Sequence, residues 1–200
     1  TGIDRLDAML GGKGYYRGSS VLVSGTAGTG KSSLGAAFVD AACRRGERCL
    51  YVAFEEAPAQ ITRNMASISL DLKQWTTQGL LRFHAVRATL CGLEQHLGSI
   101  VKLVSEFKPA IVVIDPVTNL SAIGTPQEIK AMLTQEIDLC KNNGITALFT
   151  SLTEGGDSLE QTDVGVSTLM DTWVLLRNSE TPGGERNRLL LALKSRGMSH

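Results

Sequence analysis

A glycine-rich segment directly after an apolar run constrains the fold of this 200-residue chain more than any other feature. The segment reads Gly25-Thr26-Ala27-Gly28-Thr29-Gly30-Lys31-Ser32-Ser33, and residues 25–32 match the GxxxxGK[ST] pattern completely. The glycines allow backbone N–H groups to turn inward around phosphate groups, and a following helix offers the positive end of its dipole. Lys31 is expected to contact the β- and γ-phosphates of a nucleotide, and the Ser32 hydroxyl is expected to bind Mg²⁺. Residues 25–32 therefore predict a phosphate-binding loop, called the phosphate loop below.

The remainder of the chain alternates short apolar runs with segments of helical periodicity, a pattern typical of a parallel sheet with crossover helices. The sequence predicts strands over residues 20–24, 49–54, 80–83, 110–114, 146–150, 173–177 and 188–194, and helices over 31–45, 58–68, 93–106 and 126–142. Because Thr181-Pro182-Gly183-Gly184-Glu185 is a strong turn signal, the last two strands are expected to form a hairpin at one sheet edge. A flexible glycine loop without a ligand would not need this strand–loop–helix context, so nucleotide binding is the favoured interpretation.

Acidic residues at two other strand ends are candidates for metal binding and catalysis. Asp115 ends an apolar run in a Walker B pattern and is expected to hold the Mg²⁺ shell from a strand next to that of the phosphate loop. Glu55 and Glu56 end another strand, where adjacent negative charges raise the pKa of one carboxylate and help it to accept a proton from water or a hydroxyl. Glu55 is also a candidate metal ligand. The alternatives are that Asp115 only begins a turn and that the two glutamates only complement the dipole of the helix from Pro58.

Charge and cysteine content argue against several classes of protein. The chain has 20 basic and 20 acidic residues, whereas proteins that bind nucleic acid or anionic lipid usually carry a basic excess. It has no apolar run of membrane-spanning length and no leader pattern, so we expect a cytoplasmic protein without a membrane or nucleic-acid partner. The four cysteines lack CxxC spacing, which favours reduced, partly buried thiols over a metal site.

Together these features resemble the RecA-like ATPases, and more narrowly the KaiC family of the bacterial circadian clock. The resemblance runs from Thr1-Gly2-Ile3-Asp4-Arg5-Leu6-Asp7 through the phosphate loop to Leu193-Lys194-Ser195-Arg196-Gly197-Met198-Ser199-His200, which is similar to the family's KxRGxxH tail. It implies an α/β P-loop NTPase fold, with a mostly parallel twisted sheet flanked by helices and a C-terminal β-hairpin. It also implies that residues 1–200 form a single ATPase domain that uses ATP and Mg²⁺. Because family members carry two such domains in tandem, we expect this one to be excised from a longer protein.

The same resemblance implies a homo-hexameric ring in which the tail of one subunit reaches the nucleotide of the next. Lys194, Ser195 and Arg196, together with Arg188 and His200, are then expected to contact a neighbour's ATP. The alternative is that Lys194 and Arg196 are solvated ends of an edge strand.

Two hydroxyl side chains resemble the phosphoacceptors of the family's second domain. Ser167 and Thr168 match an adjacent serine and threonine, and Thr162 matches a nearby threonine, although residues 163–166 depart from the family's pattern. The resemblance therefore implies a serine/threonine autokinase activity beside ATP hydrolysis, in a slow signalling or timing switch with regulatory clock-type protein partners. The alternative is a purely structural role, in which Ser167 caps a short helical turn and Thr168 only packs against its neighbours.

A DNA-dependent ATPase of the recombinase or helicase type is the main alternative on this fold. In those proteins, loops after the central strands contact DNA. The corresponding residues 153–163 contain no lysine or arginine but four acids, which would repel a phosphate backbone: Glu154, Asp157, Glu160 and Asp163. A third alternative, a nucleotide-binding scaffold without turnover, stays open, although Lys31, Ser32, Glu55 and Asp115 are all present.

Overall fold

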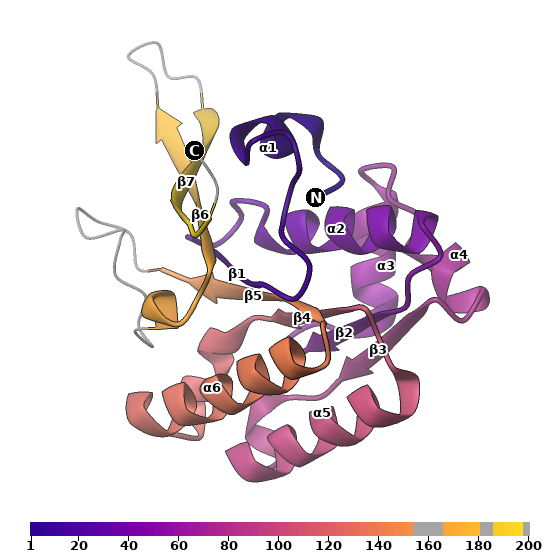
Figure 1. Ribbon diagram of the computed structural model, residues 1–200, viewed down its shortest axis with the longest axis vertical. Coiled ribbons are helices and arrows are strands. Elements are labelled where there is room, and N and C mark those ends of the chain that lie inside the picture. The colour runs from indigo at the N-terminus through magenta and orange to yellow at the C-terminus, as the bar shows by residue number, and fades with distance from the viewer. Residues whose placement is uncertain (154–165, 181–185, 198–200) are drawn as a thin grey trace.

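The computed structural model describes residues 1–153, 166–180 and 186–197, and within them seven strands form one sheet (Figure 1). The sheet order is β3-β2-β4-β5-β1-β6-β7, with parallel pairing everywhere except between β6 and β7. The strands are β1 (Ser20–Gly25), β2 (Cys49–Ala53), β3 (Leu81–Ala85), β4 (Ile111–Asp115), β5 (Thr146–Leu152), β6 (Thr172–Glu180) and β7 (Arg186–Ser195). The predicted α/β class, the mostly parallel sheet and the hairpin at one edge are confirmed, while the turn 181–185 lies outside the described residues.

Helices cover both faces of the sheet (Figure 1). One face carries α1 (Asp4–Met9), α2 (Lys31–Arg44), α3 (Pro58–Ala66) and α4 (Leu72–Thr77), and the other carries α5 (Leu93–Phe107) and α6 (Pro126–Asn142). Because successive strand residues point to opposite faces, Val21 and Val23 join the core under α2, whereas Leu22 joins the core under α5 and α6. Short 3₁₀ turns lie at η1 (Ala88–Leu90), η2 (Val117–Ala122) and η3 (Val166–Thr168).

Two helices are absent from the sequence prediction. Helices α1 and α4 have six residues each, too few to display a helical repeat of apolar positions. Tertiary contacts hold α4 in place, because the buried indole of Trp75 donates a hydrogen bond to Asp40 of α2 at 2.7 Å. In contrast, α6 begins and ends where the sequence predicts, with a capping box between Thr125 and Glu128.

The prediction that the strand of Asp115 lies next to the strand of the phosphate loop is wrong. Strand β5 lies between them and pairs with β4 on one side and with β1 on the other. The physical reason is topological, because strand order in a parallel sheet depends on the crossover connections rather than on the residues of one strand. Asp115 therefore faces the phosphate loop across an intervening strand.

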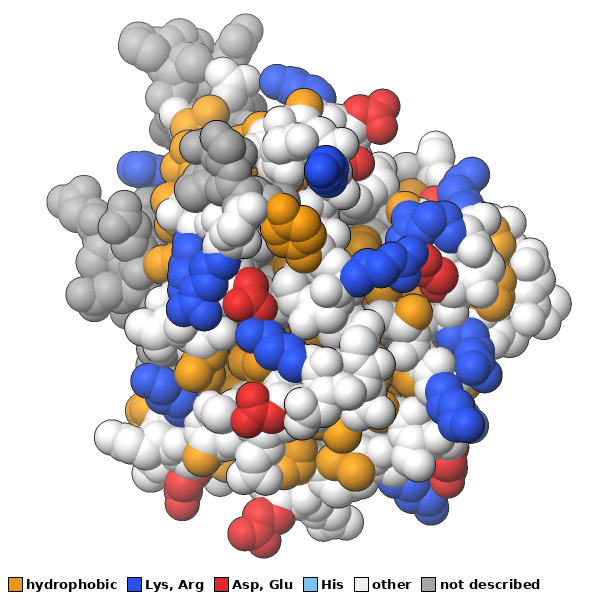
Figure 2. All heavy atoms as spheres, in the orientation of Figure 1, with side chains coloured by type: hydrophobic (Ala, Val, Ile, Leu, Met, Phe, Trp, Pro, Cys, Tyr) orange, Lys and Arg blue, Asp and Glu red, His pale blue; other side chains and the backbone are white. Residues whose placement is uncertain are grey.

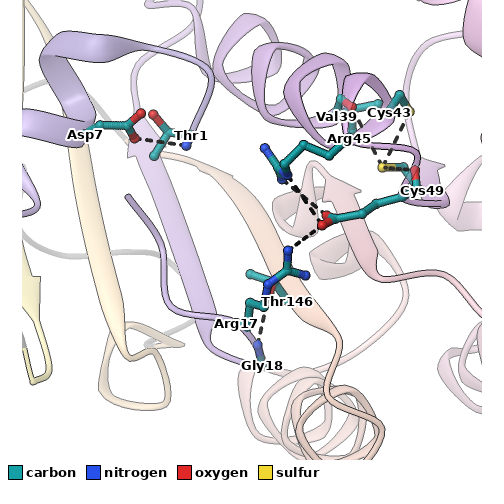
Figure 3. Close-up of polar contacts among 10 residues, drawn as sticks. Thr1, Asp7, Arg17, Gly18, Val39, Cys43, Arg45, Cys49 and Thr146 are labelled. Atoms are coloured by element: carbon teal, nitrogen blue, oxygen red, sulfur yellow. Dashed lines mark hydrogen bonds and ion pairs between the residues drawn. The ribbon is translucent and has the colours of Figure 1, made fainter. Parts of the chain in front are cut away.

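Ion pairs and a thiol contact lie at the amino end of the sheet, opposite the phosphate loop (Figure 3). Glu47 accepts from Arg17 at 2.5 Å and from Arg45 at 3.2 Å, and both arginine side chains are largely exposed. The sulfur atoms of Cys43 and Cys49 lie 3.7 Å apart, and all four cysteines of the chain are unpaired. These contacts join the end of α2 to the start of β2.

Candidate functional site

The phosphate loop joins β1 to α2 at the carboxyl end of the sheet. Gly25 ends β1 with a φ of 154°, and a Cβ atom at this position would lie 2.3 Å from the carbonyl oxygen of Leu176 in β6. Gly28 and Gly30 have φ values of 76° and 100°, a region that other residues rarely adopt. No side chain caps the amino end of α2 at Gly30, so its first N–H groups remain available to an anion.

Lys31 lies within the phosphate loop rather than in solvent. Its ammonium group donates hydrogen bonds to the carbonyl oxygens of Gly25 and Thr26, both at 2.8 Å, and its side chain is buried. Burial lowers the pKa of Lys31, and the charges of Asp115 and Glu55 act in the opposite direction. The ammonium is therefore held where phosphate oxygens could replace the two carbonyls as its partners.

The structure brings seven of the residues predicted for the phosphate loop, the metal and the base around one cavity of about 210 Å³. The cavity is lined by Ala27, Gly28, Lys31, Ser32, Glu55, Glu56, Asp115 and four further residues. Its hydroxyl and carboxylate oxygens are the hard donors that Mg²⁺ prefers, so Ser32, Asp115 and Glu55 fit such an ion chemically. A larger cavity of about 700 Å³ lies between α5 and α6, but its charged residues, Glu94 and Glu128, are acidic and would repel phosphate.

The two glutamates after β2 differ in their surroundings. Glu55 is exposed, whereas Glu56 is half-buried beside the cavity. Burial raises the pKa of Glu56, and the negative charges of Asp115 and Glu55 raise it further, while Arg63 and Asn64 lower it. Its raised pKa makes the ionised Glu56 a better proton acceptor than an ordinary glutamate.

Two hydroxyl groups that the sequence analysis does not single out hold the Asp115 carboxylate. Thr150 of β5 donates to Asp115 Oδ1, and Tyr51 of β2 donates to Asp115 Oδ2, the latter at 2.5 Å. Both partners lie on strands that flank β4, on the face that carries α2. Within an apolar run such as residues 49–54, a tyrosine looks like an ordinary core residue, and no local signal distinguishes it.

Comparison with known proteins identifies the family of the chain. A family model described as "ATPase: KaiC" matches residues 1–200. The chain belongs to the KaiC family of ATPases. This KaiC-family domain is 52% identical over 202 residues to the circadian clock protein KaiC2 of Synechocystis sp., an alignment that covers 100% of this chain and 35% of that protein.

Other relatives of this KaiC-family domain are more distant. It is 36% identical to the circadian clock oscillator protein KaiC of Parathermosynechococcus lividus and 36% identical to KaiC3 of Synechocystis sp., covering 100% of this chain and 37% and 39% of those proteins. The chain thus spans somewhat over a third of the length of these curated relatives. Family membership confirms the predicted resemblance and the RecA-like α/β class. Among the described residues, no helix combines the length and apolar character needed to cross a membrane.

The cations predicted to reach a neighbour's ATP lie at opposite ends of β7, with Arg188 at one end and Lys194 and Arg196 at the other. An Arg188 guanidinium nitrogen lies 3.9 Å from the position of a Cβ atom built on Gly30, beside the phosphate loop of the same chain. Lys194 and Arg196 lie at the opposite end, where they donate to the carbonyl oxygens of Ser167 and Thr168, each at 3.3 Å. At about 3.3 Å per residue, roughly 20 Å of strand separates the two groups.

Asp171 fixes the far end of β7 against the amino end of β1. Its carboxylate accepts from the Ser20 backbone N–H and pairs with Lys141, both at 2.9 Å, and the Arg196 backbone N–H donates to the Asp171 carbonyl at 2.8 Å. The Ser195 side chain is buried, and its hydroxyl has no hydrogen-bonding partner among the described residues.

The candidate phosphoacceptors, Ser167 and Thr168, lie at the end of β7 that contains Lys194 and Ser195. Ser167 is half-buried and Thr168 is exposed, both in η3, so the reading that Thr168 only packs does not fit its exposure. The pair precedes β6 in the chain and lies beside the carboxyl end of the edge strand β7, through the contacts of Lys194 and Arg196. Thr162, His200 and the acidic stretch 154–163 lie outside the described residues.

Proposed function

We propose that this KaiC-family domain binds ATP with Mg²⁺ and hydrolyses it to ADP and phosphate. The observation that carries the proposal is the convergence of Lys31, Ser32, Asp115, Glu55 and Glu56 on one cavity at the amino end of α2. A cation, free N–H groups, metal-binding oxygens and a proton acceptor are the parts that phosphoryl transfer needs.

Each residue has a distinct task in the proposed reaction. Lys31 and the N–H groups of the phosphate loop bind the β- and γ-phosphates and orient the terminal phosphorus. Ser32, Asp115 and Glu55 hold Mg²⁺, which neutralises phosphate charge when bound. Glu56, with Glu55 beside it, takes a proton from the attacking water, and its raised pKa favours that transfer.

Hydrolysis is tested by changing both glutamates to glutamine, which keeps their shape but removes proton acceptance. We expect the Glu55→Gln/Glu56→Gln variant to hydrolyse ATP roughly a hundredfold more slowly while it still binds ATP. The matched control is Glu94→Gln/Glu106→Gln, since both of these glutamates are exposed on α5. Equal turnover in the two double variants would refute the assignment of the base. The single variants Glu55→Gln and Glu56→Gln show which of the two glutamates accepts the proton.

We also propose that the domain works in a hexameric ring in which Lys194 and Arg196 act on the ATP of the adjacent subunit. The separation of these cations from the phosphate loop of their own chain, along roughly 20 Å of β7, supports an action between subunits. The buried Ser195 side chain would contribute only through its backbone unless the strand end rearranges. His200 stays a proposal by family resemblance.

Mixed rings test this arrangement. Arg196→Ala subunits retain a sound phosphate loop and Lys31→Ala subunits retain a sound tail, so mixing two inactive preparations should restore part of the ATPase activity. Arg188 provides the contrasting case, because it lies beside the phosphate loop of its own chain. If Arg188 acts there, mixing Arg188→Ala with Lys31→Ala subunits will restore none of the activity that Arg188→Ala loses, because each chain then lacks a residue of its own site. A monomer with full activity at every concentration would refute the ring.

The final part of the proposal is phosphate transfer to Ser167 or Thr168. The contacts of Lys194 and Arg196 with these two residues support it, because tail cations at a neighbour's ATP would bring the acceptor hydroxyls to the same nucleotide. Phosphopeptide mapping after incubation with Mg-ATP should find phosphate on the wild type and none on Ser167→Ala/Thr168→Ala or Lys31→Ala. An unmodified wild type that hydrolyses ATP would reduce the protein to a plain ATPase.

The wider role follows from the relatives, which are circadian clock proteins by name. We propose a slow signalling or timing switch in the cytoplasm, with regulatory clock-type protein partners. The DNA-dependent alternative is not favoured. On the face shown in Figure 2, the basic groups are separated by acidic and uncharged surface and form no continuous strip for a phosphate backbone.

A further inference from the structure

Tyr51 is a fully buried polar residue directly beneath the candidate metal site. Its side chain packs in the core between the sheet and α2, and its ring lies 5.4 Å from that of Phe83. A Cβ atom built on Gly35 in α2 would lie 4.0 Å from the Tyr51 hydroxyl, an ordinary van der Waals distance, so α2 packs close to the phenol. The phenol does not line the cavity itself but contacts Asp115, which does.

The Tyr51 hydroxyl contacts one of the candidate metal ligands directly. It donates a hydrogen bond to Asp115 Oδ2 at 2.5 Å. Burial raises the pKa of Tyr51, and the charge of Asp115 raises it further. The phenol has one proton, and this hydrogen bond directs it to the Asp115 carboxylate.

We propose that Tyr51 is a positioning residue for Mg²⁺, because its hydroxyl fixes the orientation of the Asp115 carboxylate that would bind the cation. The inference rests on the proposed function as an ATPase. Hydroxyl groups donate to both carboxylate oxygens, Thr150 to Oδ1 and Tyr51 to Oδ2. The carboxylate is thereby fixed in rotation, and each oxygen keeps a further lone pair for a cation.

The chain offers a matched pair of variants for the test. Tyr51→Phe removes the hydroxyl that donates to Asp115 and keeps the ring, whereas Tyr15→Phe removes a buried hydroxyl that has no partner among the described residues. Both rings pack against the same core under α2. A loss caused only by removing a buried phenol hydroxyl would therefore appear in both variants.

The measurement is binding of a fluorescent ATP analogue, first in EDTA and then during a titration with Mg²⁺. We expect Tyr51→Phe to bind the metal-free analogue as the wild type does, but to need roughly tenfold more Mg²⁺ for half-saturation, because a hydrogen bond to a charged group is lost. Tyr15→Phe should match the wild type in both arms. An unchanged Mg²⁺ requirement in Tyr51→Phe, or equal weakening in both arms, would overturn the inference.

A double-mutant cycle shows whether Tyr51 acts through Asp115. In an Asp115→Asn background, Tyr51→Phe should cause little further change in the Mg²⁺ requirement, since the acceptor it orients has lost its charge. Full additivity of the two substitutions would show that Tyr51 does not act through Asp115. If Tyr51→Phe does not fold, Thr150→Val tests the same carboxylate from its other side and is expected to raise the Mg²⁺ requirement. Failure of the wild type itself to bind the analogue would instead refute the proposed function.

Discussion

Glu136 should make the stability of this domain fall as pH rises through neutrality. The side chain lies on the core face of α6, and neither carboxyl oxygen has a hydrogen-bonding partner among the described residues. Burial raises the pKa of Glu136 to about 8, from an ordinary value of 4.5. Between these two values the unfolded chain has released a proton that the folded chain keeps, so a higher pH favours unfolding.

The size of the effect follows from proton linkage. Each pH unit in the middle of that window costs about 1.4 kcal/mol, and the slope is smaller near either pKa. The free energy of unfolding should therefore fall by about 3–4 kcal/mol between pH 5 and pH 8 on account of this group. Glu136→Gln stays neutral in both states, so its stability relative to the wild type should grow by the same amount over this range. Urea denaturation at several pH values, followed by circular dichroism, measures both proteins directly.

The control for this experiment is Asp138→Asn, because Asp138 is exposed on the same helix. Its stability should change with pH in parallel with that of the wild type. Parallel curves for the wild type and Glu136→Gln would refute the reasoning, since they would mean that Glu136 is ionised in the folded protein at neutral pH.

Three further predictions concern the site and the core. Lys31→Ala should weaken ATP binding roughly tenfold or more in a calorimetric titration, through loss of a charge-assisted contact, and an unchanged affinity would contradict the phosphate-loop assignment. Arg63→Ala removes a charge that lowers the pKa of Glu56, so the acid limb of the ATPase pH profile should move to higher pH, and a fixed limb would assign it to another group. Trp75→Phe leaves the buried Asp40 without its indole donor and should lower the free energy of unfolding by about 1–3 kcal/mol in urea denaturation, whereas a neutral result would mean that water replaces the indole.

Local patterns were sufficient for most of the fold and for the centre of the site. Short stretches of sequence indicate both the strand–loop–helix context of the phosphate loop and the acids at strand ends. The convergence of Lys31, Glu56 and Asp115 could therefore be predicted. The order of the strands could not, since it depends on crossovers between distant segments. The roles of Tyr51 and Glu136 could not be predicted from the sequence, for a related reason. One sits in an apolar strand and the other in an amphipathic helix, and only the packed sheet shows what their polar atoms face.

The strand inserted between β1 and β4 also sets an electrostatic condition at the cavity. Neighbouring strands lie about 4.8 Å apart, so the strand end that leads into the phosphate loop and the strand end at Asp115 are about 10 Å apart rather than 5 Å. At the shorter spacing an ammonium and a carboxylate would neutralise each other. At the longer one, the ammonium contacts carbonyl dipoles and the carboxylate contacts hydroxyls. Neither Lys31 nor Asp115 is therefore neutralised by an ion pair with the other. A ligand that carries both a negative and a positive group can bind between them, with its anion facing Lys31 and its cation facing Asp115.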